Sequence, residues 1–531
     1  MPYYLAHVGT TLQKLSTAGV YAGITLPAGV TIVATRPCRF ALLGNYIFIV
    51  NAPSVNLSLS AIDLTCRIAT IDGPSAALTA AVGAAGALNG DYRYRYSFII
   101  KDGSGVVITE SPMSDASDVL SLVNQQGSLS DILTSGTSGV NCRRIYRTLT
   151  GGADYYPIHD IDDNTTTTYT DSISDYDAGL LSVVDDLGNP PGHDNTDYFR
   201  LCCAWKDRVW AAGNLYKDRV YFSGNNRLYA WSNTQYFDAK VRGEDEFGVS
   251  AFMPRRDELV IAKRRRLHKI IGTAKSNFEM IQVAERIGCI SQETVVIVRD
   301  VAYFLHEDGV YSYGPEGLKP LSREKVDPWF TSDTFFNRAR FQYAFAHYNQ
   351  NYDLYELHLS AAGSTVEDRW VAWDIKKEMW LGPHKTGACT PTCAGVMDDP
   401  NGLPVPFIGA SNGHIYQKNY STRSDDGTAI QLSIIGKFHS GAQPDLDHYW
   451  GELSVINREE IAGTLSVIPR VGDLDAADQA TISVALTRDR TRCRRLGEGR
   501  FARLEFQENT NNQDVLIYGY EINPTFPLGR R

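Results

Sequence analysis

The amino-acid sequence predicts an all-β fold: a β-propeller of six to eight blades, with an inserted fibronectin- or immunoglobulin-like β-sandwich and a C-terminal β-sandwich. Short β-branched or aromatic runs between turn residues occur throughout the chain, and no segment sustains an apolar period of 3.6 residues. We expect short helices at residues 322–330 and 473–480 only. The 29 tyrosines and 45 glycines also favour strands and turns.

One hairpin pattern recurs along the chain: an apolar strand, a turn and a second strand. It is clearest at residues 301–314 and matches residues 405–418 without a gap, while residues 208–224 and 259–272 have the same layout. Asp-Gly and Asn-Gly at the turns supply the positive φ angles of a tight hairpin. Strand starts are 42 to 52 residues apart, which is typical of propeller blades. Unrelated hairpins in several sandwiches are the alternative.

The series of hairpins is interrupted once and then extended. We therefore assign residues 1–72 to the first propeller strands, 73–190 to the inserted sandwich with its linkers, 191–429 to the main blades and 430–531 to the C-terminal sandwich. Residues 73–90 are rich in Ala and Gly and are expected to be a linker. Strands every 8 to 12 residues between Asp91 and Asp175 fit an immunoglobulin-like module.

Composition excludes several classes of protein. A formal charge of −10 argues against tight binding of nucleic acid over the whole surface. No apolar run approaches the length of a membrane span, and the first residues do not resemble a secretory signal. The nine cysteines include no CxxC pair, so we expect free thiols in a reducing cytoplasm and no metal site.

Motifs for catalysis are missing, so we expect no enzyme, no catalytic residue and no cofactor. The sequence contains no GxSxG, HExxH or GxxxxGK motif. The carboxylates at 160, 162, 163, 171, 175 and 177 lack the pattern of an EF-hand loop, and we interpret them as exposed turns rather than a calcium site. Residues 244–246 and 257–258 offer the carboxylates of a glycosidase, but the repeated box of sialidases is missing.

Two basic runs are candidate contact surfaces. The first lies at a predicted hairpin turn and would project five cations: Lys263, Arg264, Arg265, Arg266 and Lys269. A solvated turn is the favoured interpretation, with contact to phosphate or to another subunit as the functional alternative. The second run holds Arg492, Arg494 and Arg495, and we interpret it as an inter-subunit contact.

Three segments resemble one family of viral proteins. Residues 288–314 carry a Gly-Cys-Ile-Ser lead-in and an Asp-Gly-Val-Tyr hairpin, residues 141–171 an Arg-Ile-Tyr-Arg strand and a Thr-Thr-Tyr-Thr-Asp ending, and residues 497–522 a pair of C-terminal strands. Taken together in chain order, the three segments resemble the propeller-bearing tail nozzle and head-to-tail DNA-stabilisation proteins of short-tailed, podovirus-like bacteriophages.

The resemblance implies a structural virion protein of the tail, assembled in the host cytoplasm as a ring of six. Such a ring would form part of the DNA ejection channel and retain packaged DNA. Its partners would be the head-to-tail adaptor or other portal-proximal proteins, tail fibres or tip proteins, and DNA passing through the lumen. A lumen lined by acidic residues would repel phosphates and let DNA slide. The alternative is a peripheral propeller that binds a host receptor or degrades glycans.

Overall fold

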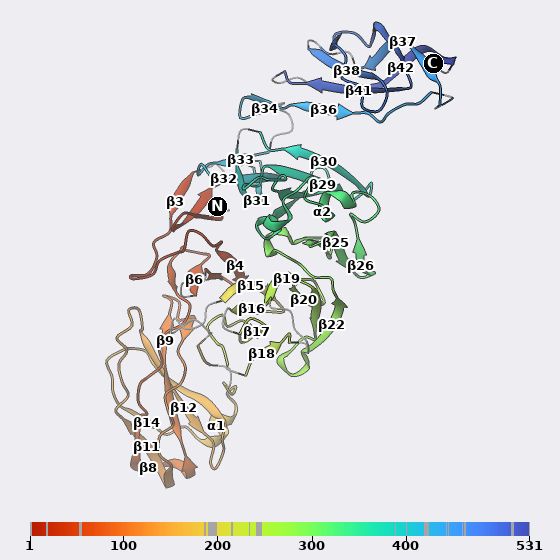
Figure 1. Ribbon diagram of the computed structural model, residues 1–531. Helices are drawn as coiled ribbons and strands as arrows, with labels where there is room; N and C mark the ends of the chain where they lie inside the picture. Colours follow the sequence, from red (N-terminus) through yellow and green to blue (C-terminus); the bar gives the residue numbers. More distant parts are fainter. Residues whose placement is uncertain are drawn as a thin grey trace. The chain divides into compact units, whose positions relative to one another are not determined.

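The computed structural model describes residues 3–16, 20–51, 56–184, 187–189, 199–213, 216–232, 234–240, 247–387, 389–399, 401–418, 424–441, 443, 445–458, 460, 463–510 and 515–529 (Figure 1). Almost all regular structure in these residues is antiparallel β-sheet, so the predicted all-β class is confirmed. The chain divides into two compact units, Met1–Pro383 with Cys393–Phe407 and His384–Thr392 with Ile408–Arg531. We call them the N-terminal and the C-terminal unit.

Small antiparallel sheets follow one another along the chain, most of them four-stranded. In chain order they are β1–β3 (Tyr3–Val8, Thr11–Ser16, Tyr21–Gly23), β4–β7 (Arg39–Leu43, Tyr46–Val50, Leu57–Ser60, Cys66–Ile68), β15–β18 (Phe199–Trp205, Arg208–Gly213, Arg219–Phe222, Tyr236–Asp238), β19–β22 (Val249–Pro254, Glu258–Lys263, Arg266–Ile271, Glu279–Glu285), β23–β26 (Val296–Val298, Val301–His306, Gly309–Gly314, Gly317–Pro320), β27–β30 (Phe345–Asn349, Leu354–Leu359, Arg369–Asp374, Met379–Lys385) and β31–β33 (Pro391–Asp398, Pro404–Ala410, Ile415–Gln417).

The sheets from β1–β3 to β27–β30 pack face to face, and each neighbouring pair shares a different apolar core. On β24, Phe304 packs with the preceding sheet β19–β22, whereas Leu305 packs with the following sheet β27–β30. Because neighbouring strand residues point to opposite faces, a sheet that is buried on both faces needs consecutive apolar residues. The run from Tyr303 to Leu305 has this composition. The arrangement is β-propeller-like.

The two ends of the series meet within the N-terminal unit. Leu12 of β2 and Leu57 of β6 share one core, so the first sheet packs on the second. The backbone N–H of Asp398, at the end of β31, donates a hydrogen bond of 2.6 Å to the hydroxyl of Tyr4 in β1. The end of β31 is therefore joined to the first sheet.

Between β7 and β15 the chain forms two sheets around a core of its own. One sheet has the order β10-β9-β12-β13 and the other β14-β11-β8. The strands are β8 (Thr79–Tyr92), β9 (Tyr94–Lys101), β10 (Val107–Glu110), β11 (Leu120–Ser130), β12 (Cys142–Thr148), β13 (Tyr155–Ile161) and β14 (Tyr169–Asp171). Their buried apolar residues form a single cluster, which includes Tyr92, Leu129 and Ile145. We call this part the sandwich.

The Ala- and Gly-rich segment is a strand for most of its length, and the prediction of a linker there is wrong. β8 pairs with β11 along both strands, with two shifts in register. A Cβ on Gly83 would lie 2.9 Å from the backbone oxygen of Gln126, and one on Gly86 would lie 2.9 Å from the backbone carbon of Gln125. The glycines are there because the two backbones approach closely, not because the segment lacks structure.

Helices are few and short in the described residues. The helix expected at residues 322–330 is reduced to α2 (Asp327–Thr331), and the one expected at 473–480 does not form. The other helix, α1 (Asp175–Gly179), follows β14. The Ser174 hydroxyl caps it by accepting a hydrogen bond from the N–H of Asp177. Neither α1 nor α2 is long and apolar enough to cross a membrane.

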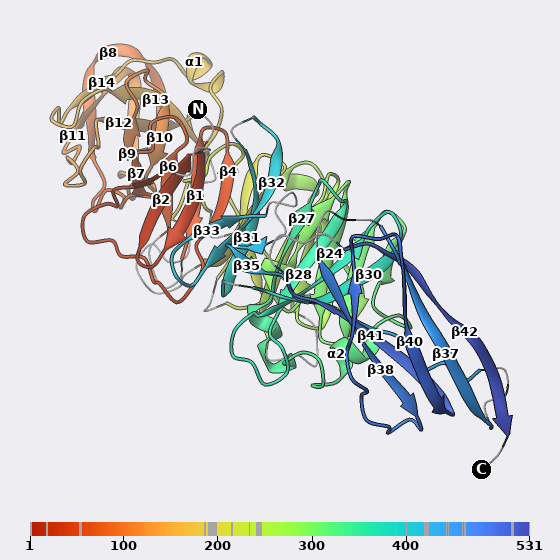
Figure 2. The ribbon, with the colours of Figure 1, turned by 90° about the horizontal axis from the view of Figure 1, so that it is seen from above.

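The C-terminal unit contains a second two-sheet sandwich (Figure 2). After the short pair β34 (Ser424–Asp425) and β35 (Thr428–Ala429), its strands are β36 (Leu432–Ile435), β37 (Asp447–Asn457), β38 (Thr464–Gly472), β39 (Ile482–Ala485), β40 (Arg490–Gly499), β41 (Phe501–Glu508) and β42 (Ile517–Gly529). The sheet orders are β36-β41-β38-β39 and β40-β37-β42, and Trp450, Leu465 and Phe506 belong to the shared core.

Candidate functional site

The first basic run lies where the sequence predicted a hairpin turn. Arg264 and Arg265 are the turn residues between β20 and β21, and Lys263 ends β20. Lys263 does not project into solvent, because its side chain is 0% exposed and its Nζ lies 2.9 Å from Asp218 Oδ1. The expectation that five cations project from this turn is therefore wrong for Lys263. Its strand is covered on both faces, and the ammonium group is held by an internal carboxylate.

The other cations of this run also lie beside carboxylates. Arg264 Nε and Arg265 Nε are 2.5 and 3.0 Å from the two carboxylate oxygens of Glu307, in the turn between β24 and β25. Burial raises the pKa of Glu307, but hydrogen bonds from both guanidinium groups outweigh that effect and lower it. Lys269 and Arg266 pair with Glu258 and Glu285, at 3.0 and 3.9 Å. The run mainly joins neighbouring sheets.

The second basic run forms β40, an edge strand that the sequence analysis did not predict. Arg492, Arg494 and Arg495 are all exposed on it. Arg494 donates a hydrogen bond of 2.7 Å to the backbone oxygen of Ala480. Within the part of the chain that the structure describes, β40 pairs with β37 on one side and lies at the edge of its sheet. This placement leaves the three arginines available to a partner.

The acidic residues of the sandwich face basic residues of β9 and β12. Arg147 and Asp171 are both 0% exposed and lie 2.7 Å apart, so the interpretation of all these carboxylates as exposed turns is wrong for Asp171. Lys101 Nζ lies 2.9 Å from Asp160 and 2.6 Å from Asp162. The lysine ammonium thus sits where a cation between these two carboxylates would bind.

The carboxylates considered for a glycosidase do not form a described pair of catalytic acids. Glu258 contacts Arg255 and Lys269, while Asp257 is exposed and lies 4.0 Å from Lys206. The acidic run at residues 244–246 lies outside the described residues.

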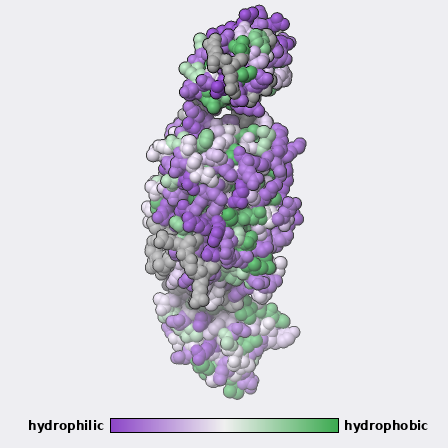
Figure 3. Space-filling model, turned by 45° about the vertical axis from the view of Figure 1, so that its right-hand side comes forward, coloured by the Kyte–Doolittle hydropathy of each residue, from purple (hydrophilic) through white to green (hydrophobic). Residues whose placement is uncertain are grey.

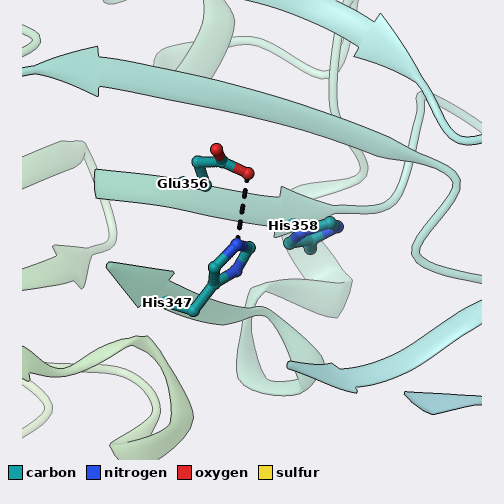
Figure 4. Close-up of side chains that lie close together, drawn as sticks. All are labelled: His347, Glu356 and His358. Carbon is teal, nitrogen blue, oxygen red and sulfur yellow. Dashed lines mark ion pairs between the residues drawn. The ribbon is translucent and has the colours of Figure 1, made fainter. Parts of the chain in front are cut away.

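A buried cluster that the sequence analysis missed lies on β27 and β28 (Figure 4). It consists of His347 on β27 and of Glu356 and His358 on β28. His347 is directly opposite Glu356 in the antiparallel register, and its Nε2 lies 3.2 Å from Glu356 Oε2. One possible ligand atom from each of the three residues lies within 4.8 Å of the other two. The three side chains are at most 3% exposed.

The cluster is oriented by its neighbours on the same face of the sheet. Asn349 Nδ2 donates a hydrogen bond of 2.7 Å to Glu356 Oε1. The His358 ring stacks on Phe345, with centroids 4.7 Å apart and planes 12° from parallel. Both contacts restrict the rotamers of the possible ligands. Imidazole nitrogens with a carboxylate oxygen are ligands that divalent transition metals accept.

The sequence carried a signal for this cluster, although a weak one. Glu356 and His358 are two positions apart and must share one face of a strand. His347 comes nine residues earlier and lies on the partner strand because residues 350–353 form the turn. Only the hairpin register brings the three together, so no spacing motif of a known zinc site matches them.

The C-terminal unit has an open groove along one side. It has a volume of about 500 Å³, and its lining includes Phe438, His439, Trp450, Tyr520 and Ile522. His439 Nε2 lies 2.5 Å from the Tyr520 hydroxyl at its base. The groove lies by the edge strand β42 of one sheet and the segment after β36, the edge strand of the other.

The two strands nearest in sequence to the lining residues of this groove, β36 and β42, also carry exposed apolar side chains. On or next to β36 and β42 the exposed large apolar residues are Ile430, Ile434, Ile435, Leu516, Tyr518, Phe526 and Leu528. Tyr518 and Ile435 are the most exposed, at 67% and 58%. Figure 3 shows hydrophobic residues among hydrophilic ones on the surface of this unit. Long edge strands with exposed apolar side chains are surfaces that pair with other chains.

Comparisons with known sequence families and with curated proteins found no match. Among solved structures, Hsv2 of Kluyvelomyces marxianus is 6% identical with a TM-score of 0.27, over 52% of this chain and 73% of that one. The computationally designed Ika8 protein is 8% identical with a TM-score of 0.31. BamB of Moraxella catarrhalis is 10% identical with a TM-score of 0.31. The comparisons with Ika8 and with BamB each cover 78% of this chain and 94% of the other chain. Likenesses this weak carry no argument about function.

Proposed function

We propose that this chain is a structural subunit of a ring in the tail of a short-tailed bacteriophage, where the ring forms part of the DNA ejection channel. The resemblance to tail nozzle proteins rests on three segments, and each belongs to a separately packed part of the chain. Residues 288–314 lead into and form the hairpin of β24 and β25, residues 141–171 span β12 to β14, and residues 497–522 run from the end of β40 into β42. Their coincidence with these structural parts supports the proposal.

The observation that carries the proposal is the open apolar edge of the C-terminal unit. A chain that works alone gains nothing from a long edge strand with exposed Tyr518, Phe526 and Leu528 beside a groove. We assign this edge to contact with a second copy of the chain. Burying apolar surface at about 25 cal/mol per Å² gives such a contact its favourable free energy.

The opposite edge of the same sheet has a different chemistry, which favours a ring. β40 exposes Arg492, Arg494 and Arg495, whereas β42 exposes apolar and aromatic side chains. A contact between two unlike edges is heterologous, and heterologous contacts close into rings when the rotation allows it. Guanidinium groups also stack well on aromatic rings such as that of Tyr518.

We further propose the finer architecture. Seven successive sheets, β1–β3, β4–β7 and the five that follow the sandwich, fit a seven-bladed propeller within the described part of the chain. The sandwich between β7 and β15 fits an inserted domain, because it leaves one blade and the chain returns to form the next. A rigid propeller wall suits a channel that DNA passes without being held.

The experiment is to measure the assembly state of the purified chain by native mass spectrometry and negative-stain electron microscopy. We expect closed rings of six. Replacing both Ile435 and Tyr518 by Ser should shift the chain to monomers, while Ile62→Ser, at a residue 76% exposed in the N-terminal unit, should leave the rings intact. A wild-type chain that stays monomeric at high concentration, or that forms trimers cleaving polysaccharide, would contradict the proposal, and the second result would support the peripheral alternative.

A further inference from the structure

We propose that His347, Glu356 and His358 bind one divalent transition-metal ion, Zn²⁺ by its ligand chemistry, which holds β27 and β28 together as a structural ion. The site is separate from the proposed assembly edges in the C-terminal unit. Four features of the cluster support this ion: the spacing of the ligand atoms, the geometry at His347, the buried carboxylate and the face of the sheet that the cluster occupies.

The spacing of the ligand atoms fits a shared ion. With metal–ligand distances of about 2.0–2.2 Å, two ligands of a tetrahedral zinc lie roughly 3.4 Å apart. His347 Nε2 and Glu356 Oε2 are separated by 3.2 Å. One possible ligand atom from each of the three residues lies within 4.8 Å of the other two. Binding of an ion would require the His358 side chain to move closer to the other two while it stays stacked on Phe345.

The contact between His347 and Glu356 is close but is not a hydrogen bond. Both ring nitrogens of His347 are buried and make no hydrogen bond with a described residue, although Nε2 is only 3.2 Å from Glu356 Oε2. In a hydrogen bond the N–H would point at the oxygen. Two ligands that point at a common ion lie side by side at this distance instead.

The buried carboxylate needs a positive charge. Glu356 is 0% exposed, and an ionised carboxylate away from water is costly unless a cation compensates it. In the sandwich that role falls to Arg147, which lies 2.7 Å from the equally buried Asp171. At Glu356 the neighbouring base is an imidazole, which is a metal ligand in its neutral form. Asn349 holds the other carboxylate oxygen, as the outer partner of a ligating carboxylate does.

The cluster also replaces an apolar core on its face of the sheet. The opposite face of β28 carries Tyr355 and Leu357, which belong to the core shared with β23–β26. On β24, the residues that face the following sheet are Tyr303 and Leu305, and they belong to an apolar core. On β28, the residues on the face away from this core are Glu356 and His358. Polar ligands in place of apolar residues reduce the hydrophobic contribution at this face, and metal–ligand bonds restore the stability.

The test is to purify the full-length chain without a histidine tag and to measure its metal content by elemental mass spectrometry. We expect about one zinc per chain. Glu356→Gln and His358→Gln should each lower the zinc content at least tenfold. The control is His306→Gln: His306 is also buried, and it lies 3.8 Å from Asp308 on the neighbouring sheet, so the zinc content should not change.

A second measurement keeps the proposal testable if a variant fails to fold. Wild-type chain stripped by a chelator should melt at a lower temperature, and stoichiometric Zn²⁺ should restore the melting temperature. Co²⁺ added to the stripped chain should give the visible absorption of a four- or five-coordinate ion. A stripped chain that binds neither ion would overturn the proposal. Equal zinc content in the wild type and all variants would overturn it as well.

Discussion

At the scale of single residues, the fold depends on cations that are completely buried. Arg143, Arg147 and Lys263 all have side chains 0% exposed, and each reaches a carboxylate within 3 Å. Removing one partner of such a pair leaves an uncompensated buried charge, which costs far more than losing a surface ion pair. The charged residues of the sequence therefore fall into two groups, those in buried ion pairs and those in surface ion pairs. Composition does not distinguish these groups.

The basic turn provides a direct comparison of the two groups. Lys263→Met keeps the volume of the side chain but removes the partner of Asp218, and it should lower the free energy of unfolding by about 3 kcal/mol, at the lower end of the range for buried pairs because Asp218 is 15% exposed. Arg265→Met, at a side chain 57% exposed, should cost less than about 1 kcal/mol. Chemical denaturation followed by tryptophan fluorescence measures both. Equal costs for the two substitutions would mean that Lys263 is not held as described.

At the scale of elements, the sequence predicts strands well where their pattern is local. Residues 301–314 form the expected hairpin, because β-branched and aromatic runs between turn residues specify a strand without reference to distant residues. β8 and β40 were missed because their compositions, rich in Ala and Gly or in Arg, are unusual for strands. Pairing with β11 and β37 makes them strands, and pairing partners are not visible in a local pattern.

The same limit applies to the candidate site. The basic turn was found because its residues are consecutive, whereas its ion pairs with Asp218 and Glu307 depend on neighbouring sheets. The cluster of His347, Glu356 and His358 depends on the register of one hairpin. The groove of the C-terminal unit depends on which strands lie at the sheet edges, and that is a property of topology.

The close approach of β8 to β11 gives a prediction for an element. Gly86→Ala would place a Cβ 2.5 Å from Gln126 Cγ and 2.9 Å from the backbone carbon of Gln125, so we expect a loss of about 1–3 kcal/mol from overpacking. Gly103→Ala, in a turn of the same sandwich with open space around the new Cβ, should be nearly neutral. Thermal unfolding followed by circular dichroism compares the two. If Gly86→Ala is also neutral, the two strands do not approach as closely as described.

At the scale of the whole molecule, separate cores point to parts that fold separately. The apolar core of the sandwich is formed by buried side chains between Ile71 and Ala178. The sheets before and after the sandwich, β4–β7 and β15–β18, share another core with each other. Tyr46 packs against both cores. A hydrogen bond of 3.2 Å from the Thr109 hydroxyl to the backbone oxygen of Ala69 also joins the sandwich to the preceding strands. These two connections involve far fewer side chains than the packing inside either core.

Removal of the sandwich is therefore the decisive test of the proposed insertion. A chain in which a short Gly-Ser linker replaces residues 74–184 should keep its β-sheet signal and unfold cooperatively, because Phe48, Phe199 and Trp231 still form the core between the two flanking sheets. We expect a modest loss of stability, since Tyr46 loses part of its cover. The predicted boundary at residue 190 lies outside the described residues, so the linker is attached after Val184. Circular dichroism and size-exclusion chromatography measure the result. Aggregation or loss of β structure in the shortened chain would show that the sheets of the N-terminal unit need the sandwich, and they would then not form an independent propeller.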